Sequence, residues 1–150
     1  MNNVIKAAIK ILLPFALIST FFMMSNIVYA GEFAKHKLVI QMSTDDPRTQ
    51  QIALNNAANM IKFYGINDIN IEIVAYGPGL GLLTGKSKHA SRVESMAMQN
   101  IDFSACGNTM SKVEKKTGTR PSLLKGIIEV KAGVARIMVL QEQGYAYVRP

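Results

Sequence analysis

Short apolar runs alternate with longer segments of helical periodicity from Lys37 to the end of the chain. Runs rich in β-branched residues predict strands, and apolar residues near a 3.6-residue spacing predict helices. The expected strands are 37–42, 70–76, 101–105, 127–130 and 145–148. The expected helices are 47–64, 90–99, 108–116 and 134–143. Because parallel neighbours need crossover connections, this alternation predicts a doubly wound α/β domain. Its sheet is mostly parallel and five-stranded, with helices on both faces.

Individual residues sharpen the expected ends of these elements. Asp46 is a suitable N-cap for the first helix, Pro47 suits its first position and Gly65 its end. In the last helix, the residues expected to face inward are Ile137, Met138 and Leu140.

The N-terminal segment 1–30 has the three parts of a secretory signal peptide. Lys6 and Lys10 precede an apolar run over 11–24, and the small residue Ala30 follows. The run is about 14 residues long, short of the roughly 20 that span a bilayer, which favours cleavage over retention as an anchor. No later segment is apolar for long enough to cross a membrane. The sequence therefore predicts an exported, periplasmic protein.

Cleavage leaves a short lead, 31–36, and one α/β domain, 37–150. Loss of the two signal lysines lowers the net charge from +7 to +5, a mildly basic balance. The basic residues that cluster are Lys86, Lys88 and Arg92, and then Lys112, Lys115, Lys116 and Arg120. Aromatic residues do not interleave with them, as they usually do on nucleic-acid surfaces, so we expect solvated faces and no nucleic-acid partner.

Ligands of doubly wound sheets collect beyond the carboxyl ends of the strands. Cys106, the only cysteine of the chain, follows one of these ends and opens the helix expected from about Asn108. Helix dipole and free amides favour an anion there and should lower the pKa of the thiol. Cys106 is the expected catalytic residue. A buried structural cysteine is the equally weighted alternative. The expected ligand-binding residues are Ser43, Asp45, Tyr76, Gly77, Gly79, Gly107, Asn108 and Thr109.

The glycines of 77–81 invite a phosphate-loop interpretation, but Leu80 stands where a P-loop needs glycine before Gly85-Lys86-Ser87. A dinucleotide fingerprint fails on spacing as well. A tight turn with close backbone approach is favoured, and its glycines could also let a ligand near the backbone.

The carboxylates at 45–46 would repel a flavin phosphate. His36 and His89 have no partners at metal-ligand spacing. We therefore expect neither cofactor nor metal.

Four segments together resemble the DsrE/DsrF-like family of sulfur-relay proteins, in particular its exported single-domain branch. They are 37–46 (KLVIQMSTDD), 73–80 (IVAYGPGL), 104–110 (SACGNTM) and 132–150 (AGVARIMVLQEQGYAYVRP). The resemblance implies a doubly wound α/β fold and assembly into homo- or hetero-oligomers, often trimers or hexamers, and we expect a homo-oligomer here. It also implies a cysteine, here Cys106, that takes sulfur as a persulfide and passes it to a partner protein without a cofactor.

Three functions follow from these residues. The first is a periplasmic protein that binds or relays sulfur as a persulfide on Cys106, a carrier more than a turnover enzyme, whose donor and acceptor proteins are unknown. The second is a non-catalytic small-ligand or protein-binding module of the same fold, in which the cysteine is structural. The third, a nucleophilic hydrolase, lacks an evident base and carries the lowest weight.

Overall fold

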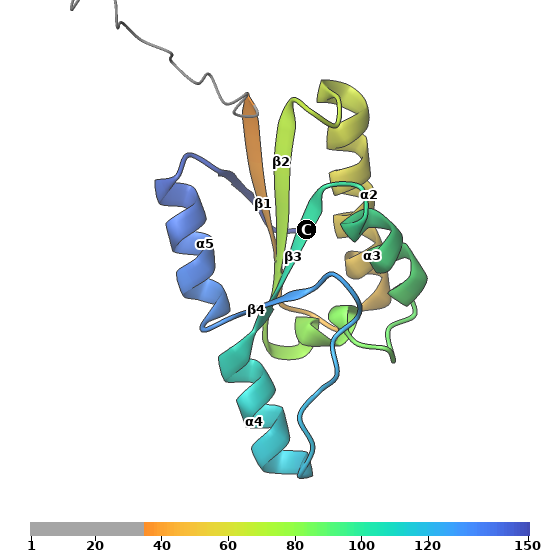
Figure 1. The fold of residues 1–150 in the computed structure, drawn as a ribbon, viewed down its shortest axis with the longest axis vertical. Helices are drawn as coiled ribbons and strands as arrows, with labels where there is room; N and C mark the ends of the chain where they lie inside the picture. The colour runs from red at the N-terminus through yellow and green to blue at the C-terminus, as the bar shows by residue number, and fades with distance from the viewer. Residues whose placement is uncertain (1–34) are drawn as a thin grey trace, which may run out of the picture. The chain divides into compact units, whose positions relative to one another are not determined.

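Five parallel strands form the sheet of the computed structural model, which describes residues 35–150 (Figure 1). They lie in the order β4-β3-β2-β1-β5, and every neighbouring pair is parallel. The strands are β1 (His36–Met42), β2 (Ile69–Ala75), β3 (Ile101–Cys106), β4 (Ile128–Val130) and β5 (Ala146–Val148). The predicted signal peptide, 1–30, and the first part of the predicted lead lie outside the described residues.

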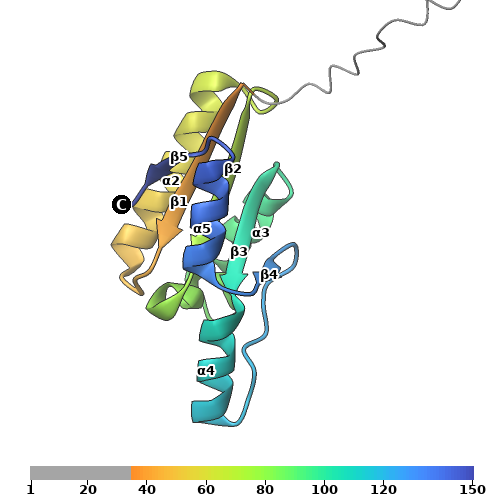
Figure 2. The ribbon, with the colours of Figure 1, turned by 90° about the vertical axis from the view of Figure 1, so that its left-hand side faces the viewer.

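Helices connect these strands and lie on both faces of the sheet. They are α2 (Pro47–Tyr64), the 3-10 helix η1 (Gly77–Leu83), α3 (Ala90–Ala97), α4 (Gly107–Thr117) and α5 (Gly133–Glu142). Figures 1 and 2 show α2 and α3 on one face and α5 on the other, with α4 extending from the carboxyl end of β3. The predicted doubly wound α/β fold is thus confirmed.

The two faces of the sheet bury cores of different size. Alternate residues of the central strands, such as Ile40, Ile73 and Phe103, belong to the larger core under α2, η1 and α3. The smaller core under α5 consists of Val39, Val74, Ile137 and Leu140. The α5 side of β3 therefore carries fewer covering residues, and polar side chains occupy part of it.

Local chemistry explains how α2 begins and ends. The Asp46 carboxylate accepts hydrogen bonds from the Thr49 amide at 2.8 Å and the Thr49 hydroxyl at 2.6 Å. These bonds satisfy a free amide of the first turn, and Pro47 follows as the first helical residue. Gly65, with φ of 96°, ends the helix and donates its amide to Ile61. The predicted cap and stop are confirmed.

Two details differ from the sequence expectations. Met138 is 58% exposed rather than inward-facing, because α5 presents only Gly133, Ile137 and Leu140 as buried residues to the sheet. Helix α4 begins at Gly107, one residue early, so Cys106 itself becomes the N-cap.

The Gly77–Leu83 segment combines a helical turn with close packing. A Cβ atom added to Gly79 would collide with the backbone carbonyl of Met42, so only glycine fits there without a shift. The expected close backbone approach is therefore confirmed, while the segment itself is a 3-10 helix rather than a simple turn. Among the helices of residues 35–150, none combines the length and apolar character needed to cross a membrane.

Candidate functional site

The sulfur of Cys106 sits where a strand becomes a helix. Cys106 is the last residue of β3 and the N-cap of α4, with extended backbone angles (φ −73°, ψ 112°). Because side chains alternate along a strand, Phe103 and Ala105 enter the larger core while Ser104 and Cys106 belong to the α5 side. The residue is 5% exposed. The thiol thus lies just below the surface at the carboxyl edge of the sheet.

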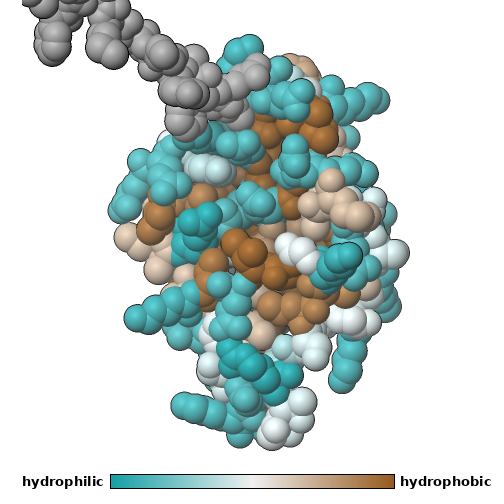
Figure 3. Space-filling model, viewed as in Figure 1, coloured by the Kyte–Doolittle hydropathy of each residue, from teal (hydrophilic) through white to brown (hydrophobic). Residues whose placement is uncertain are grey.

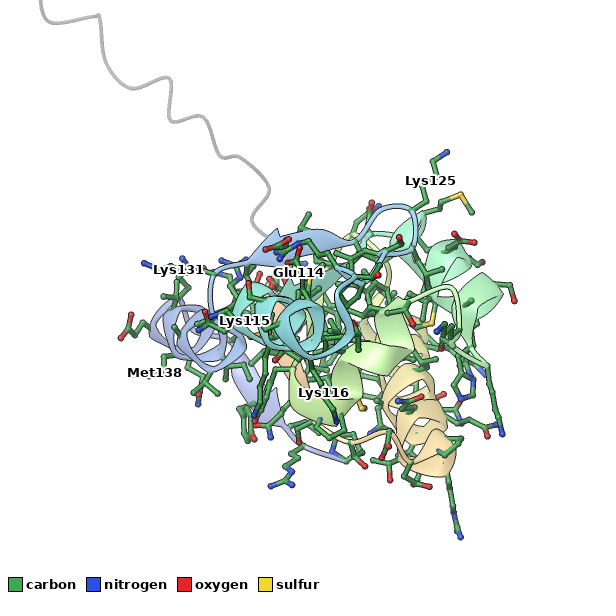
Figure 4. The ribbon with its side chains drawn as sticks, turned by 90° about the horizontal axis from the view of Figure 1, so that it is seen from below. Glu114, Lys115, Lys116, Lys125, Lys131 and Met138 are labelled. Carbon is green, nitrogen blue, oxygen red and sulfur yellow. The ribbon has the colours of Figure 1, made fainter. Side chains whose placement is uncertain are left out.

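Two helix N-termini converge on this thiol. Helix α4 begins at the next residue, and α5 begins at Gly133, which packs directly on Cys106. A Cβ added to Gly133 would lie 3.3 Å from the Cβ of Cys106 and 3.1 Å from the Cβ of Tyr76. Figure 4 looks along α4 and shows α5 beside it. Both helices therefore direct the positive ends of their dipoles toward the sulfur.

Hydrogen-bond donors around Cys106 favour its anion. Burial raises the pKa of the Cys106 thiol, but hydrogen bonding from the Thr109 hydroxyl and from the amides of Gly133, Thr109 and Asn108 outweighs this effect. The pKa consequently lies below its ordinary value. The Cys106 side chain makes no capping hydrogen bond in α4.

Thr109 links the thiol to the loop after β2. Its Oγ1 accepts a hydrogen bond from the Gly77 amide at 3.0 Å. Since that amide uses an acceptor position of the hydroxyl, the single hydroxyl proton stays free for the sulfur. This bond aligns the Thr109 hydroxyl and explains why the glycine segment and Cys106 belong to one site.

Gly107 and Asn108 fix the start of α4 against the segment after β3. A Cβ on Gly107 would lie 2.7 Å from Oε1 of Glu129 and 3.2 Å from the carbonyl oxygen of Val130. The Asn108 amide donates to the Lys131 carbonyl at 3.2 Å. The close approach of these backbones holds the N-terminal turn of α4 in place.

A buried ion pair supports the same face of the sheet and was missed by the sequence prediction. Glu72 in β2 is 1% exposed, and its two carboxylate oxygens accept from Nε and NH2 of Arg136 at 2.8 and 2.7 Å. The Ser104 hydroxyl also donates to Glu72, at 2.5 Å. Arg136 lies one turn after Gly133 in α5. The ion pair therefore ties the first turn of α5 to the sheet beside Cys106.

The Glu72 carboxylate changes the pKa of Asp102, its neighbour on β3. Burial and the Glu72 carboxylate raise the pKa of Asp102, and Arg136 partly opposes them. One sequence feature could have indicated this buried ion pair, because Glu72 is a charged residue within the largely apolar strand INIEIVA. A charge in such a strand needs a buried partner, although the sequence does not identify it.

The structure brings together most, but not all, of the predicted site residues. Tyr76, Gly77, Gly107, Asn108 and Thr109 surround or support Cys106 through the contacts above.

Ser43 and Asp45 are not part of this cluster. They follow β1, and β2 separates that strand from β3. The Ser43 hydroxyl accepts from Gln41 at 3.3 Å, and Asp45 is exposed. Gly79 packs against the backbone of Met42, so its role is structural.

The contacts of His36 and His89 are with residues other than Cys106. The His36 ring stacks on Tyr64 at 3.8 Å between centroids, at the amino end of β1. His89 Nε2 lies 3.2 Å from the Pro47 carbonyl oxygen. Within residues 35–150, no three His, Cys, Asp or Glu side chains are grouped to hold a metal ion.

The fold and this edge site define an α/β protein with one thiol at the carboxyl end of a parallel sheet. No family model matches the sequence, and no curated protein matches it. A solved structure, that of the protein of unknown function MTH1491 from Methanobacterium thermoautotrophicum, is similar to this chain. The two are 29% identical with a TM-score of 0.69, over 77% of this chain and 99% of that chain. The similarity supports the α/β architecture.

Proposed function

We propose that this chain is a periplasmic DsrE/DsrF-like sulfur carrier that binds or relays sulfur as a persulfide on Cys106. The observation that supports it is a thiol of lowered pKa between the N-termini of α4 and α5. Export rests on the signal-peptide pattern of 1–30. Cell fractionation and a mature mass beginning at Gly31 would support export, whereas a full-length membrane-bound chain would contradict it.

The proposed transfer needs no cofactor. The Cys106 thiolate attacks the outer sulfur of a donor persulfide, R–S–SH. A new S–S bond forms to Cys106, the donor S–S bond breaks, and RS⁻ leaves with the electron pair. Attack by an acceptor thiolate on that outer sulfur then returns Cys106 as thiolate. The amides and the Thr109 hydroxyl that stabilise the thiolate would also stabilise the persulfide anion.

Intact mass after incubation with polysulfide tests the carrier directly. Wild type is expected to gain the mass of one or more sulfur atoms, which dithiothreitol removes, and Cys106→Ser is expected to gain none. Because the chain has a single cysteine, the serine variant is a complete control. An unmodified wild type, or the same adduct on the serine variant, would contradict the proposal.

A second candidate, a binding module with a structural cysteine, is favoured by the 5% exposure of Cys106. The rate of iodoacetamide alkylation against pH separates the two. If Cys106 acts as a carrier, the alkylation rate should reach half of its maximum at a pH below the ordinary thiol pKa of about 8.5. Thr109→Val is expected to raise the pH of half-maximal alkylation, since the hydrogen bond from the Thr109 hydroxyl that lowers the pKa of Cys106 is lost. Thr119→Val, at an exposed position, is the matched control.

The same shift predicts how stability varies with pH. A thiol whose folded-state pKa is depressed contributes stability above its unfolded pKa of about 8.5, and this contribution is lost as the pH falls through the folded-state value. Slow alkylation at every pH and no pH-dependent stability difference from Cys106→Ser would favour the binding module.

We further propose that the carrier assembles as a homo-oligomer through the outer side of α5. Val134 and Met138, one turn apart, are 55% and 58% exposed, and the edge strand β5 carries the partly exposed Tyr147 and Val148. Figure 3 likewise shows apolar surface among the polar side chains of one face. Light scattering of wild type should give a multiple of the chain mass and Met138→Glu a smaller one. A monomeric wild type would contradict this assembly.

A further inference from the structure

A cleft of about 750 Å³ lies between η1, the C-terminal half of α4 and the segment that follows α4. Its walls include the apolar side chains of Pro78, Leu80, Val113 and Pro121. Figure 4 views the molecule from this end. Volumes of this order are typical of small-molecule sites, which are mostly apolar with a few polar groups. The cleft therefore has the size and walls of a ligand site.

The charges that line the cleft have one sign. Lys86 and Arg120 are among its lining residues, and no acidic residue of 35–150 is. Arg120 is already paired with two carboxylates, because NH1 lies 2.8 Å from Glu114 and NH2 lies 2.6 Å from Glu129. Lys86 has no such ion pair among the described residues. Lys86 is thus the cation of the lining that is open to an anionic ligand.

The cleft is close to the thiol but separate from it. Val113 lies one helical turn, about 6 Å, after Thr109 on α4. Gly77 lines the cleft and also donates its amide to Thr109. Cys106 is not among the lining residues. A molecule in the cleft would therefore contact the support of the thiol site without needing the sulfur itself.

We infer that this cleft binds a small organic anion that has an apolar body and a single carboxylate or sulfonate group. The apolar body fits between the walls formed by Leu80 and Val113, and the anionic group pairs with the Lys86 ammonium. This inference goes beyond the carrier function, since binding is independent of Cys106 and involves no covalent step.

Fluorescence titration of the full chain with anilinonaphthalene sulfonate, which combines an apolar body with one sulfonate, tests the inference. Wild type is expected to bind the probe saturably at one site. Lys86→Gln should weaken binding about three- to fivefold and Lys86→Glu more than tenfold, as expected for losing and then reversing one partly solvated charge. Lys88→Gln, a neighbouring lysine outside the lining, and Cys106→Ser should bind as wild type does.

Circular dichroism must show the same folded signal for every variant, because the probe also binds loosely packed chains. Non-saturable binding, or equal weakening by the Lys86 and Lys88 variants, would overturn the inference. A normal titration by Cys106→Ser would uphold the cleft even if no persulfide forms on the wild type. Failure of the ligand site and failure of the carrier are thereby distinguished.

Discussion

Replacing Arg136 by methionine is expected to lower the free energy of unfolding by about 3–5 kcal/mol, because it leaves a buried carboxylate without its partner. Glu72 is 1% exposed, and Arg136 supplies both of its charged hydrogen bonds. Ser104 alone would remain as a donor. Urea denaturation at neutral pH measures the loss. The same substitution should slow alkylation of Cys106, since it releases the first turn of α5, where the Gly133 amide lies.

The structure offers a matched control and a rescue. Arg120 likewise forms two charged hydrogen bonds, one each to Glu114 and Glu129, but the side chains involved are 38% to 46% exposed, so Arg120→Met should cost at most about 1 kcal/mol. Adding Glu72→Gln to Arg136→Met removes the stranded charge and should recover much of the loss. If the Arg136 and Arg120 variants lose equal stability, the buried pair does not hold α5 as described.

Among the glycines of residues 35–150, Gly79 is where an added methyl is expected to be most damaging, and Gly79→Ala should lose about 3 kcal/mol, at the upper end of the usual cost of overpacking. The added Cβ would collide with the Met42 carbonyl, and the following backbone amide of Ser43 is also too close at 2.9 Å. Backbone atoms cannot rotate away as a flexible side chain can. Thermal and urea unfolding of the variant would measure the loss.

Gly81→Ala, in the same 3-10 helix, is the control. Nothing lies within 4 Å of a Cβ built on Gly81, and its φ is not positive. Its stability should stay within about 1 kcal/mol of wild type, with a small gain allowed by the stiffer unfolded chain. A Gly79 variant as stable as the Gly81 variant would show that η1 can move away from β1.

Much of the fold could be predicted because its signals are local. Strands β1 and β2 are runs rich in apolar and β-branched residues, and Asp46, Pro47 and Gly65 identify the ends of α2 by their own chemistry. Cys106 and Thr109 were predicted for a similar reason, since strand–helix alternation places the residues that follow each strand at the carboxyl edge of a parallel sheet. Met138 was placed wrongly because α5 is apolar on more than one side, so periodicity does not determine which side meets the sheet.

The rest of the site depends on contacts between distant residues. Gly133 contributes an amide only because α5 crosses back over β3, and Arg136 meets Glu72 across 64 positions of sequence. Ser43 and Asp45 were expected beside Cys106 because they also follow a strand, but an intervening strand keeps them apart. These three residues all lie at the carboxyl edge of the sheet, so the order of the strands decides which residues lie next to Cys106.

The pairing of β5 with β1 has a consequence for the order in which the molecule is completed. The Tyr147 hydroxyl donates to Gln41 at 2.5 Å across 106 positions, and within residues 35–150 β5 pairs with β1 alone. During synthesis, almost the entire domain must therefore be made before β5 can pair with the free edge of β1. Closing so long a loop is slow and entropically costly. A chain whose sheet closes this late stays unfolded for longer during synthesis, which would suit the export proposed above.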